Sequence, residues 1–182
     1  MIERPKDFEI ELNGRPVPNA PVGWWIDREF ALVDLKGKIK LGKNELLLRT
    51  KMRTDTGLEA MYLAGDFGVD WKTLDLVAEP RELKTGDWVK QGYAQYSGSM
   101  IYKQSIRLDP KKGERLFLAM DKSAFAGVCF SVRVNGKDAG LVPWPPYEIE
   151  ITRLVKKGKN DIEIELVGSR RNLFGPLHLK EA

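Results

Sequence analysis

Residues 132–160 read VRVNGKDAGLVPWPPYEIEITRLVKKGKN, and residues 10–44 hold a related stretch, IELNGRPVPNAPVGWWIDREFALVDLKGKIKLGKN. Each copy contains a strand-like run, an Asn-Gly pair, tryptophan, a second run led by an aromatic residue, and Gly-Lys-Asn before another apolar run. Asn-Gly predicts a β-hairpin because both residues tolerate positive φ. Two copies of one supersecondary unit predict two related β-structures in a single chain.

Apolar and polar residues alternate along most of the strand-like segments. The alternation is clear in FEIEL (8–12), MIYKQSIRL (100–108), PYEIEIT (146–152) and DIEIEL (161–166). This pattern is typical of antiparallel strands with one buried and one solvated face. Many short strands separated by Gly and Pro turns favour an all-β fold, and we expect a jelly-roll β-sandwich.

The two copies differ in what precedes them. Strand patterns at about 100–108 and 114–120 precede the second copy, so residues 79–182 are expected to form a complete jelly roll. No such strands precede the first copy, and residues 1–78 are expected to form a partial, related sandwich. A partial sandwich leaves unpaired edges and apolar surface. We expect it either to pack against the rest of the chain or, as the favoured alternative, to pair with a second copy in a homodimer.

Composition excludes several classes of partner. The chain has 182 residues, 42% of them hydrophobic, which is enough for one ordinary domain or two small ones. Its net charge is only +4 and its basic residues form no stripe or motif, so nucleic acid is not expected. No apolar run reaches the roughly 20 residues of a membrane helix, and the start has no signal-peptide core. We expect no membrane partner, and the compartment stays open.

Two long stretches resemble a known sugar-binding module. GDWVKQGYAQYSGSMIYKQSIRL (86–108) and FSVRVNGKDAGLVPWPPYEIEITRLVKKGKNDIEIELVGSRRNLFGPLH (130–178) resemble the two halves of the galactose-binding-like β-sandwich of family 2 glycoside hydrolases and related rhamnosidase-type enzymes. LEAMYLAGDFGV (58–69) is similar to the end of the sandwich that precedes it in bacterial proteins of this group. The resemblance implies an eight-stranded jelly roll with an ancillary role beside a catalytic barrel. No barrel is present in this sequence.

The same resemblance implies a structural calcium ion in some modules. Calcium requires several oxygen ligands. Asp66, Asp70 and Asp121 are candidates, although no loop has a dense acidic spacing. No other cofactor is expected.

Catalysis is not expected. A glycosidase needs two carboxyl groups across a cleft, one of them with a raised pKa. The carboxyl pairs here, which lie on the polar sides of alternating strands, are Glu148 with Glu150 and Glu163 with Glu165. His178 is the single histidine, and Cys129 has no basic neighbour that would make it a thiolate. Neither residue has the partners of a nucleophile or a general base.

Aromatic residues carry the sugar-binding hypothesis. The C–H face of a sugar ring stacks on a flat aromatic ring, and amide and guanidinium groups hydrogen-bond to its hydroxyls. The candidate sugar-binding residues are Trp24, Trp25, Trp88, Tyr93, Tyr96, Trp144, Arg171 and Asn172. The alternative is a structural role, because sandwiches commonly bury tryptophan. In an extended strand Trp24 and Trp25 point opposite ways, so we expect one to be buried and one exposed.

We therefore expect a non-catalytic carbohydrate-binding or ancillary module whose ligand is a polysaccharide or oligosaccharide. The alternative is a structural or assembly β-sandwich module that binds no sugar and packs against another domain or a second copy.

Overall fold

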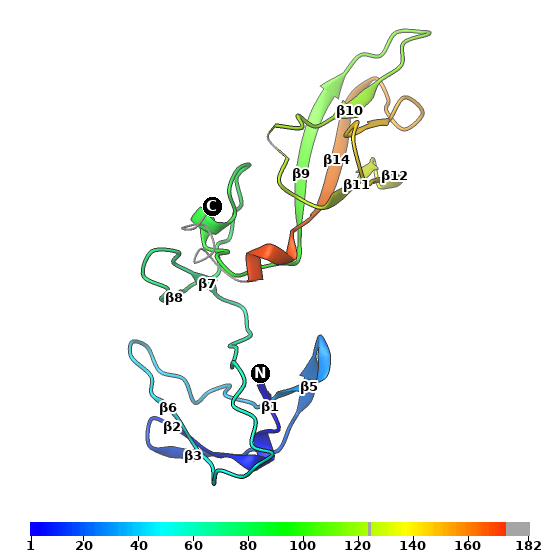
Figure 1. Ribbon diagram of the computed structural model, residues 1–182. Coiled ribbons are helices and arrows are strands. Elements are labelled where there is room, and N and C mark those ends of the chain that lie inside the picture. Colours follow the sequence, from blue (N-terminus) through cyan, green and yellow to red (C-terminus); the bar gives the residue numbers. More distant parts are fainter. Residues whose placement is uncertain (124, 174–182) are drawn as a thin grey trace. The chain divides into compact units, whose positions relative to one another are not determined.

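The structure is a computed structural model that describes residues 1–123 and 125–173 (Figure 1). It contains fourteen strands and two short 3-10 helices, and the described residues form no α-helix. Every pair of neighbouring strands within a sheet is antiparallel. The expected all-β fold is thereby confirmed. Over the same residues, no helix has the length and hydropathy needed to cross a bilayer.

The chain divides into two compact units, an N-terminal unit (Met1–Gly65) and a C-terminal unit (Asp66–Ala182). This division falls earlier than the 78–79 boundary expected from the sequence. The reason is that β7 (Gly68–Val69) pairs with β8 (Leu76–Val77), and Val69 also forms a parallel bridge to Tyr93. Residues 66–78 therefore belong with the C-terminal unit.

The C-terminal unit contains a β-sandwich made of two sheets. Its strands are β9 (Ser99–Leu108), β10 (Phe117–Ala119), β11 (Cys129–Val134), β12 (Lys137–Val142), β13 (Glu148–Glu150) and β14 (Gly158–Val167), and η2 (Val89–Gln91) precedes them. One sheet has the order β12-β11-β14-β9, and the other pairs β10 with β13. Phe130, Val132 and Val134 of β11 are fully buried and pack with Leu118 and Ile149 of the second sheet.

The alternation of the sequence explains this core. Every second residue of β11 points to the same face, which the β10–β13 sheet covers. Burying a large aliphatic or aromatic side chain contributes roughly 1.5–3 kcal/mol. The β11–β12 hairpin turns at Asn135 (φ 52°) and Gly136 (φ 77°), the pair of positive angles that the Asn-Gly signal predicts.

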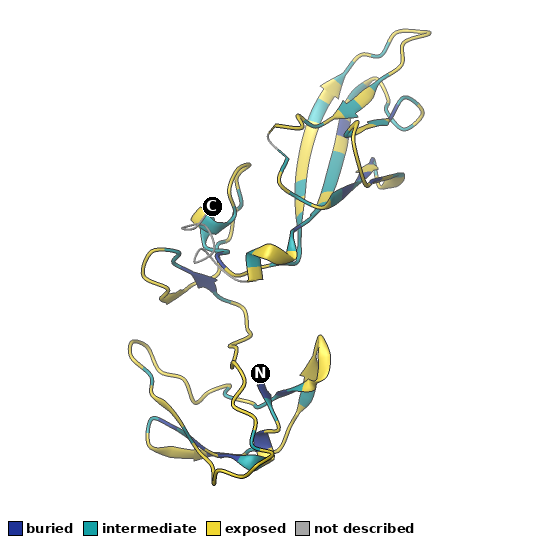
Figure 2. Ribbon diagram, viewed as in Figure 1, coloured by how far each residue is buried: buried dark blue, intermediate teal, exposed yellow. Residues whose placement is uncertain are grey.

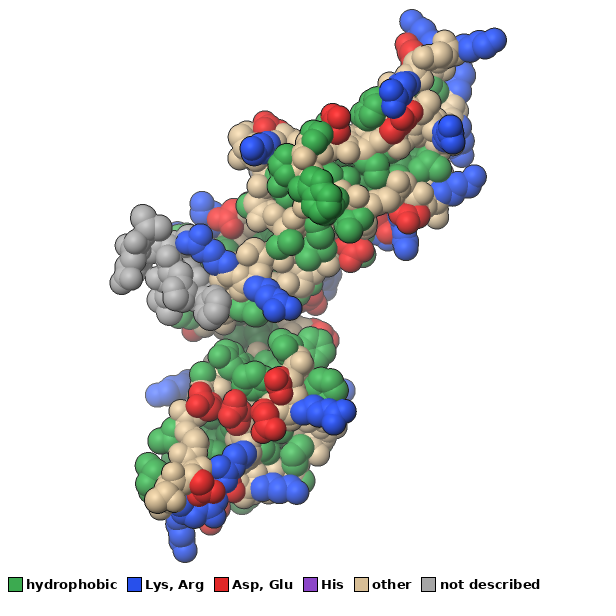
Figure 3. Space-filling view, turned by 45° about the vertical axis from the view of Figure 1, so that its right-hand side comes forward, with side chains coloured by type: hydrophobic (Ala, Val, Ile, Leu, Met, Phe, Trp, Pro, Cys, Tyr) green, Lys and Arg blue, Asp and Glu red, His purple; other side chains and the backbone are tan. Residues whose placement is uncertain are grey.

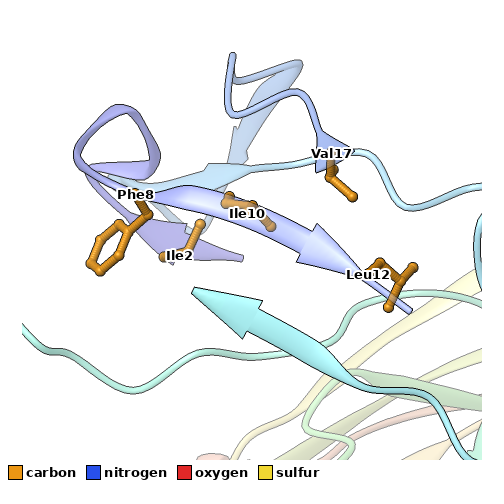
Figure 4. Packing of buried hydrophobic residues seen from close by; sticks show 5 residues of the cluster. All are labelled: Ile2, Phe8, Ile10, Leu12 and Val17. Atoms are coloured by element: carbon orange, nitrogen blue, oxygen red, sulfur yellow. The ribbon is translucent and has the colours of Figure 1, made fainter. Parts of the chain in front are cut away.

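The N-terminal unit has two three-stranded sheets, β3-β2-β6 and β1-β5-β4. Its elements are β1 (Ile2–Glu3), η1 (Pro5–Asp7), β2 (Glu9–Leu12), β3 (Arg15–Val17), β4 (Gly23–Trp25), β5 (Asp27–Leu32) and β6 (Leu46–Arg49). Its small core consists of Ile2, Phe8, Ile10, Leu12 and Val17 (Figure 4).

An asparagine pair joins two turns of the N-terminal unit. The Asn13 side-chain amide donates to Asn44 Oδ1 over 2.9 Å, and the Lys40 N–H donates to the same oxygen over 3.0 Å. Asn44 Nδ2 donates in turn to the carbonyls of Lys40 and Gly42, at 2.8 and 2.9 Å. One side chain therefore holds the Asn-Gly hairpin against the Gly-Lys-Asn turn.

The C-terminal unit contains the same network. Asn160 Oδ1 accepts from Asn135 Nδ2 at 2.9 Å and from the Lys156 N–H at 2.8 Å, and Asn160 Nδ2 donates to the carbonyls of Lys156 and Gly158 at 2.7 and 3.0 Å. Asn160 is fully buried, whereas Asn44 is half-buried. The repeated sequence motif thus forms one hydrogen-bond arrangement in both units.

Candidate functional site

Trp88 has a structural environment. Its indole Nε1 donates to the Tyr102 hydroxyl over 2.6 Å, and its ring lies 6.4 Å from the ring of Tyr96. The ring also covers Gly168, where an added Cβ would lie 2.7 Å from a Trp88 carbon. The indole N–H of Trp88 is thus used inside the protein, and its half-buried ring packs against Gly168 and Tyr96.

Tyr93, Tyr96 and Asn172 form one packed group. The two tyrosine rings lie 5.5 Å apart, and Asn172 Nδ2 donates to the backbone carbonyls of both residues. The Tyr96 hydroxyl donates to the Ser99 carbonyl over 2.8 Å. Burial, and secondly the charge of Glu79, raise the pKa of both tyrosine hydroxyls. Asn172 therefore positions the 93–96 loop, and its amide donor is already used.

Trp24 and Trp25 are both exposed, at 54% and 56%, which corrects the expectation that one is buried. Most of the β4–β5 hairpin is exposed or half-buried (Figure 2). The cause is a register shift in the β4–β5 pair: Trp24 faces Ala31, but Trp25 faces Asp27. A bulge of this kind breaks the strict alternation of side chains. Ile26, at the hairpin tip, has φ 67° and is also exposed.

Trp144 is the most exposed tryptophan of the sugar-binding candidates, at 71%. It lies between β12 and β13 and is followed by Pro145 and Pro146. These prolines line an open depression of about 520 Å³. Its other lining residues are Ala119, Met120, Lys122, Tyr147 and Glu148. We call Trp144 and this depression the Trp144 ledge.

The floor of the ledge is fixed to the core. The Tyr147 ring packs 4.5 Å from Phe125 and 6.4 Å from Phe130, between ring centroids. The Tyr147 carbonyl accepts from the Met120 N–H over 2.8 Å, which extends the β10–β13 pairing to the ledge. Lys122 and Glu148 are exposed at its rim. The depression thus combines an apolar floor with two charged groups. The exposed indole of Trp144 does not line it but precedes its first proline, Pro145, by one residue.

The sequence did not predict Ala119, Met120 and Lys122 as site residues. They lie about 25 residues before Pro145 and come beside it because Ala119 pairs with Glu148 in the β10–β13 ladder. Only the register of that short ladder could have found them.

A second depression, of about 360 Å³, lies on the polar face of the four-stranded sheet. Its charged groups bind one another: Glu163 pairs with Lys103 at 3.0 Å and with Arg133 at 3.9 Å, and the Ser105 hydroxyl donates to Asp161. The surface is polar and internally paired, and no aromatic residue lines it.

Glu150 is held as a carboxylate. A hydrogen bond from Arg115 and a second from Thr152 lower its pKa to about 2. A general acid needs a pKa near the working pH. Glu150 therefore has the opposite of the property that glycoside cleavage requires of its acid.

The remaining candidates form no centre. Over residues 1–123 and 125–173, no three His, Cys, Asp or Glu side chains lie close enough together to hold a metal ion. Asp70 and Asp121 each accept backbone N–H groups of their own turns. Cys129 is half-buried in β11, and Arg171 is exposed. His178 lies outside the described residues.

No protein-family model matches the sequence, and a search of curated proteins finds no match. Among solved structures, the chain is similar to a rhamnosidase from Novosphingobium sp. PP1Y, with 21% sequence identity and a TM-score of 0.41. The match covers 91% of this chain but 17% of the rhamnosidase, so the chain spans a small part of that enzyme's length.

Proposed function

We propose that the chain is a non-catalytic carbohydrate-binding module, and that the Trp144 ledge holds the sugar. The observation that carries the proposal is the 71% exposure of Trp144 beside an apolar depression with polar groups at its rim. Four of the other predicted site residues of this unit, Trp88, Tyr93, Tyr96 and Asn172, use their polar atoms or rings within the fold. The fifth, Arg171, is exposed.

The chemistry of the ledge suits a sugar. An exposed indole offers a flat, electron-rich face to the C–H groups of a pyranose ring. The Lys122 ammonium group can donate hydrogen bonds to hydroxyl oxygens, and the Glu148 carboxylate can accept them from hydroxyl groups. Because the depression is open, it suits part of a long glycan better than a small molecule, which protein pockets usually enclose on most sides.

An assembly role is the second candidate, and a separate observation favours it. The N-terminal unit exposes many large apolar side chains, among them Leu41, Met52 and Leu58. Hydrophobic side chains are visible on the face of this unit that Figure 3 shows. Exposed apolar patches of a soluble domain commonly mark interaction sites. A module of this kind would pack against another domain or a second copy and bind no sugar.

A polysaccharide screen followed by calorimetry tests the first proposal. Soluble plant and bacterial polysaccharides would be screened by pull-down, and binding of the best ligand measured for wild type and Trp144→Ala. We expect Trp144→Ala to abolish binding and leave the melting temperature nearly unchanged, because an exposed side chain contributes little to stability. Trp25→Ala is the matched control, an equally large truncation in the other unit, and should keep wild-type binding.

Two results would count against the ledge. Undiminished binding by Trp144→Ala would place the sugar elsewhere. A large fall in the melting temperature of that variant would show a packed structural residue. If no polysaccharide binds the wild-type protein, the assembly role becomes the better proposal.

A further inference from the structure

The sheet β3-β2-β6 of the N-terminal unit and the four-stranded sheet of the C-terminal unit align corresponding strands in the same way. β6 pairs with β2 so that Ile10 faces Leu48, and β14 pairs with β11 so that Val132 faces Ile164. The asparagine networks lie at the same end of both strand pairs, one residue after β2 and β11. β6 is therefore the counterpart of β14.

The two counterparts differ at their second edge. β14 has β11 on one side and β9 on the other, and β9 pairs with it from Ser99 to Leu108. β6 has β2 on one side, and none of the described residues forms a strand on its other side. Leu47 of β6 remains 38% exposed. An unpaired edge that carries apolar side chains is a template for another strand.

Backbone geometry determines which residues an added strand would contact. The Asn13 N–H donates to the Glu45 carbonyl over 2.8 Å. Since backbone groups alternate in direction along an antiparallel ladder, Leu47 and Arg49 also direct theirs toward β2. The N–H and C=O groups of Leu46 and Leu48 therefore point away from β2, to the free edge.

The stretch Glu45-Leu46-Leu47-Leu48-Arg49 is complementary to itself when it is reversed. We propose that the added strand is β6 of a second copy of this chain, paired antiparallel with Leu47 facing Leu47 across a twofold axis. Leu46 of one copy then faces Leu48 of the other, which joins their outward backbone groups. Glu45 faces Arg49 at both ends, so opposite charges meet twice. Such isologous pairing satisfies both free edges at once.

The free edge of β9, a longer edge strand than β6, lacks this complementarity. Its charged residues are Lys103 and Arg107, and it carries no acidic residue. Two copies of β9 would therefore bring two cations each to one ladder. Charged side chains on an edge strand are a common protection against pairing. The charges thus select β6 rather than β9 as the surface that meets a second copy.

Sedimentation equilibrium of the full chain at micromolar concentration tests the proposal. We expect a wild-type dimer and a monomeric Leu47→Arg variant, because two guanidinium groups would face each other across the axis. Ile101→Arg on β9, at a position 54% exposed, is the matched control and should remain dimeric. A monomeric wild type would mean that a different partner covers the β6 edge. Dissociation by Ile101→Arg alone would place the interface on β9, and either result overturns the proposal.

Cross-linking tests the register itself. Facing residues of a non-hydrogen-bonded antiparallel pair have Cα atoms about 4.5 Å apart, within the range of a disulfide. In a Cys129→Ala background, Leu47→Cys should therefore form a covalent dimer under mild oxidation. Leu46→Cys should not, because it faces Leu48. Equal cross-linking of the two variants, or none at Leu47→Cys, would refute this register. Neither test uses the Trp144 ledge, so the outcome is separate from that of sugar binding.

Discussion

Truncation of Asn160 should destabilise the C-terminal unit more than any other single amide truncation in the repeated motif. Asn160 has no exposed surface and makes four hydrogen bonds, two as acceptor and two as donor. Asn160→Ala removes all four. It also leaves the N–H and C=O of Lys156 and the carbonyl of Gly158 without this partner. Asn135 Nδ2 keeps a bond to the Leu154 carbonyl at 2.9 Å.

The expected cost follows from these bonds. A typical intramolecular hydrogen bond contributes about 1 kcal/mol net, so the loss of four bonds costs about 4 kcal/mol. Because the groups left unpaired are buried, water does not replace these bonds. The same change at Asn44 removes the same four bonds. Asn44 is half-buried, so water replaces part of what is lost, and we expect about 1–2 kcal/mol. The two variants form a matched pair in which burial is the main difference.

Hydrogen–deuterium exchange with mass spectrometry is the suitable assay, because it reports on each unit separately. A loss of about 4 kcal/mol corresponds to roughly a thousandfold faster exchange of the β11 and β14 amides in Asn160→Ala. The β2 and β6 amides should be unchanged in that variant and only modestly faster in Asn44→Ala. If Asn44→Ala proves as costly as Asn160→Ala, burial does not set the strength of these networks and the reasoning fails.

Three further predictions concern packing, pH and catalysis. Gly168→Ala should lower the melting temperature, with a cost of about 1–3 kcal/mol from overpacking against Trp88, whereas Gly57→Ala, which has open space, should be neutral. The pKa of Glu150 in the folded protein is lowered to about 2 from 4.5. Its contribution to the free energy of unfolding should therefore be present above pH 4.5 and disappear as the pH falls toward 2. Melting temperatures of Glu150→Gln, measured over the same pH range, should lack this acid-dependent loss. No aryl glycoside should be hydrolysed, and turnover that disappears in Glu163→Gln would contradict this.

The strands were predictable from sequence because their signal is local. Alternation over 100–108 and 161–166 corresponds to β9 (Ser99–Leu108) and β14 (Gly158–Val167), and each Asn-Gly pair lies at a hairpin turn. A buried face repeats every second residue whatever the remote partner is. Composition and period therefore suffice for element type, although not for strand ends.

The candidate site was predictable only in part. An aromatic residue in a loop looks the same in the sequence whether it packs within the fold or is exposed to a ligand. Trp88 and Trp144 both lie outside strands, but Tyr102 accepts from the indole of Trp88, while Trp144 projects into solvent. The difference depends on residues that are distant in sequence. The bulge at Trp25 was equally hidden, since a register shift depends on how the turn closes rather than on the alternation before it.

A dimer through β6 would carry two Trp144 ledges, and this has a measurable consequence for sugar binding. If both proposals hold, a polysaccharide long enough to reach both ledges engages the second at high effective concentration, and avidity can exceed single-site affinity by about 10²–10⁴. A short oligosaccharide fills one ledge and gains nothing from the dimer. We therefore expect Leu47→Arg to weaken binding of the polymer strongly while leaving calorimetric affinity for the oligosaccharide unchanged. Trp144→Ala should abolish both. Equal affinity of wild type and Leu47→Arg for the polymer would show that the two ledges do not act together, because a chain bridging them must lose its advantage when the dimer dissociates.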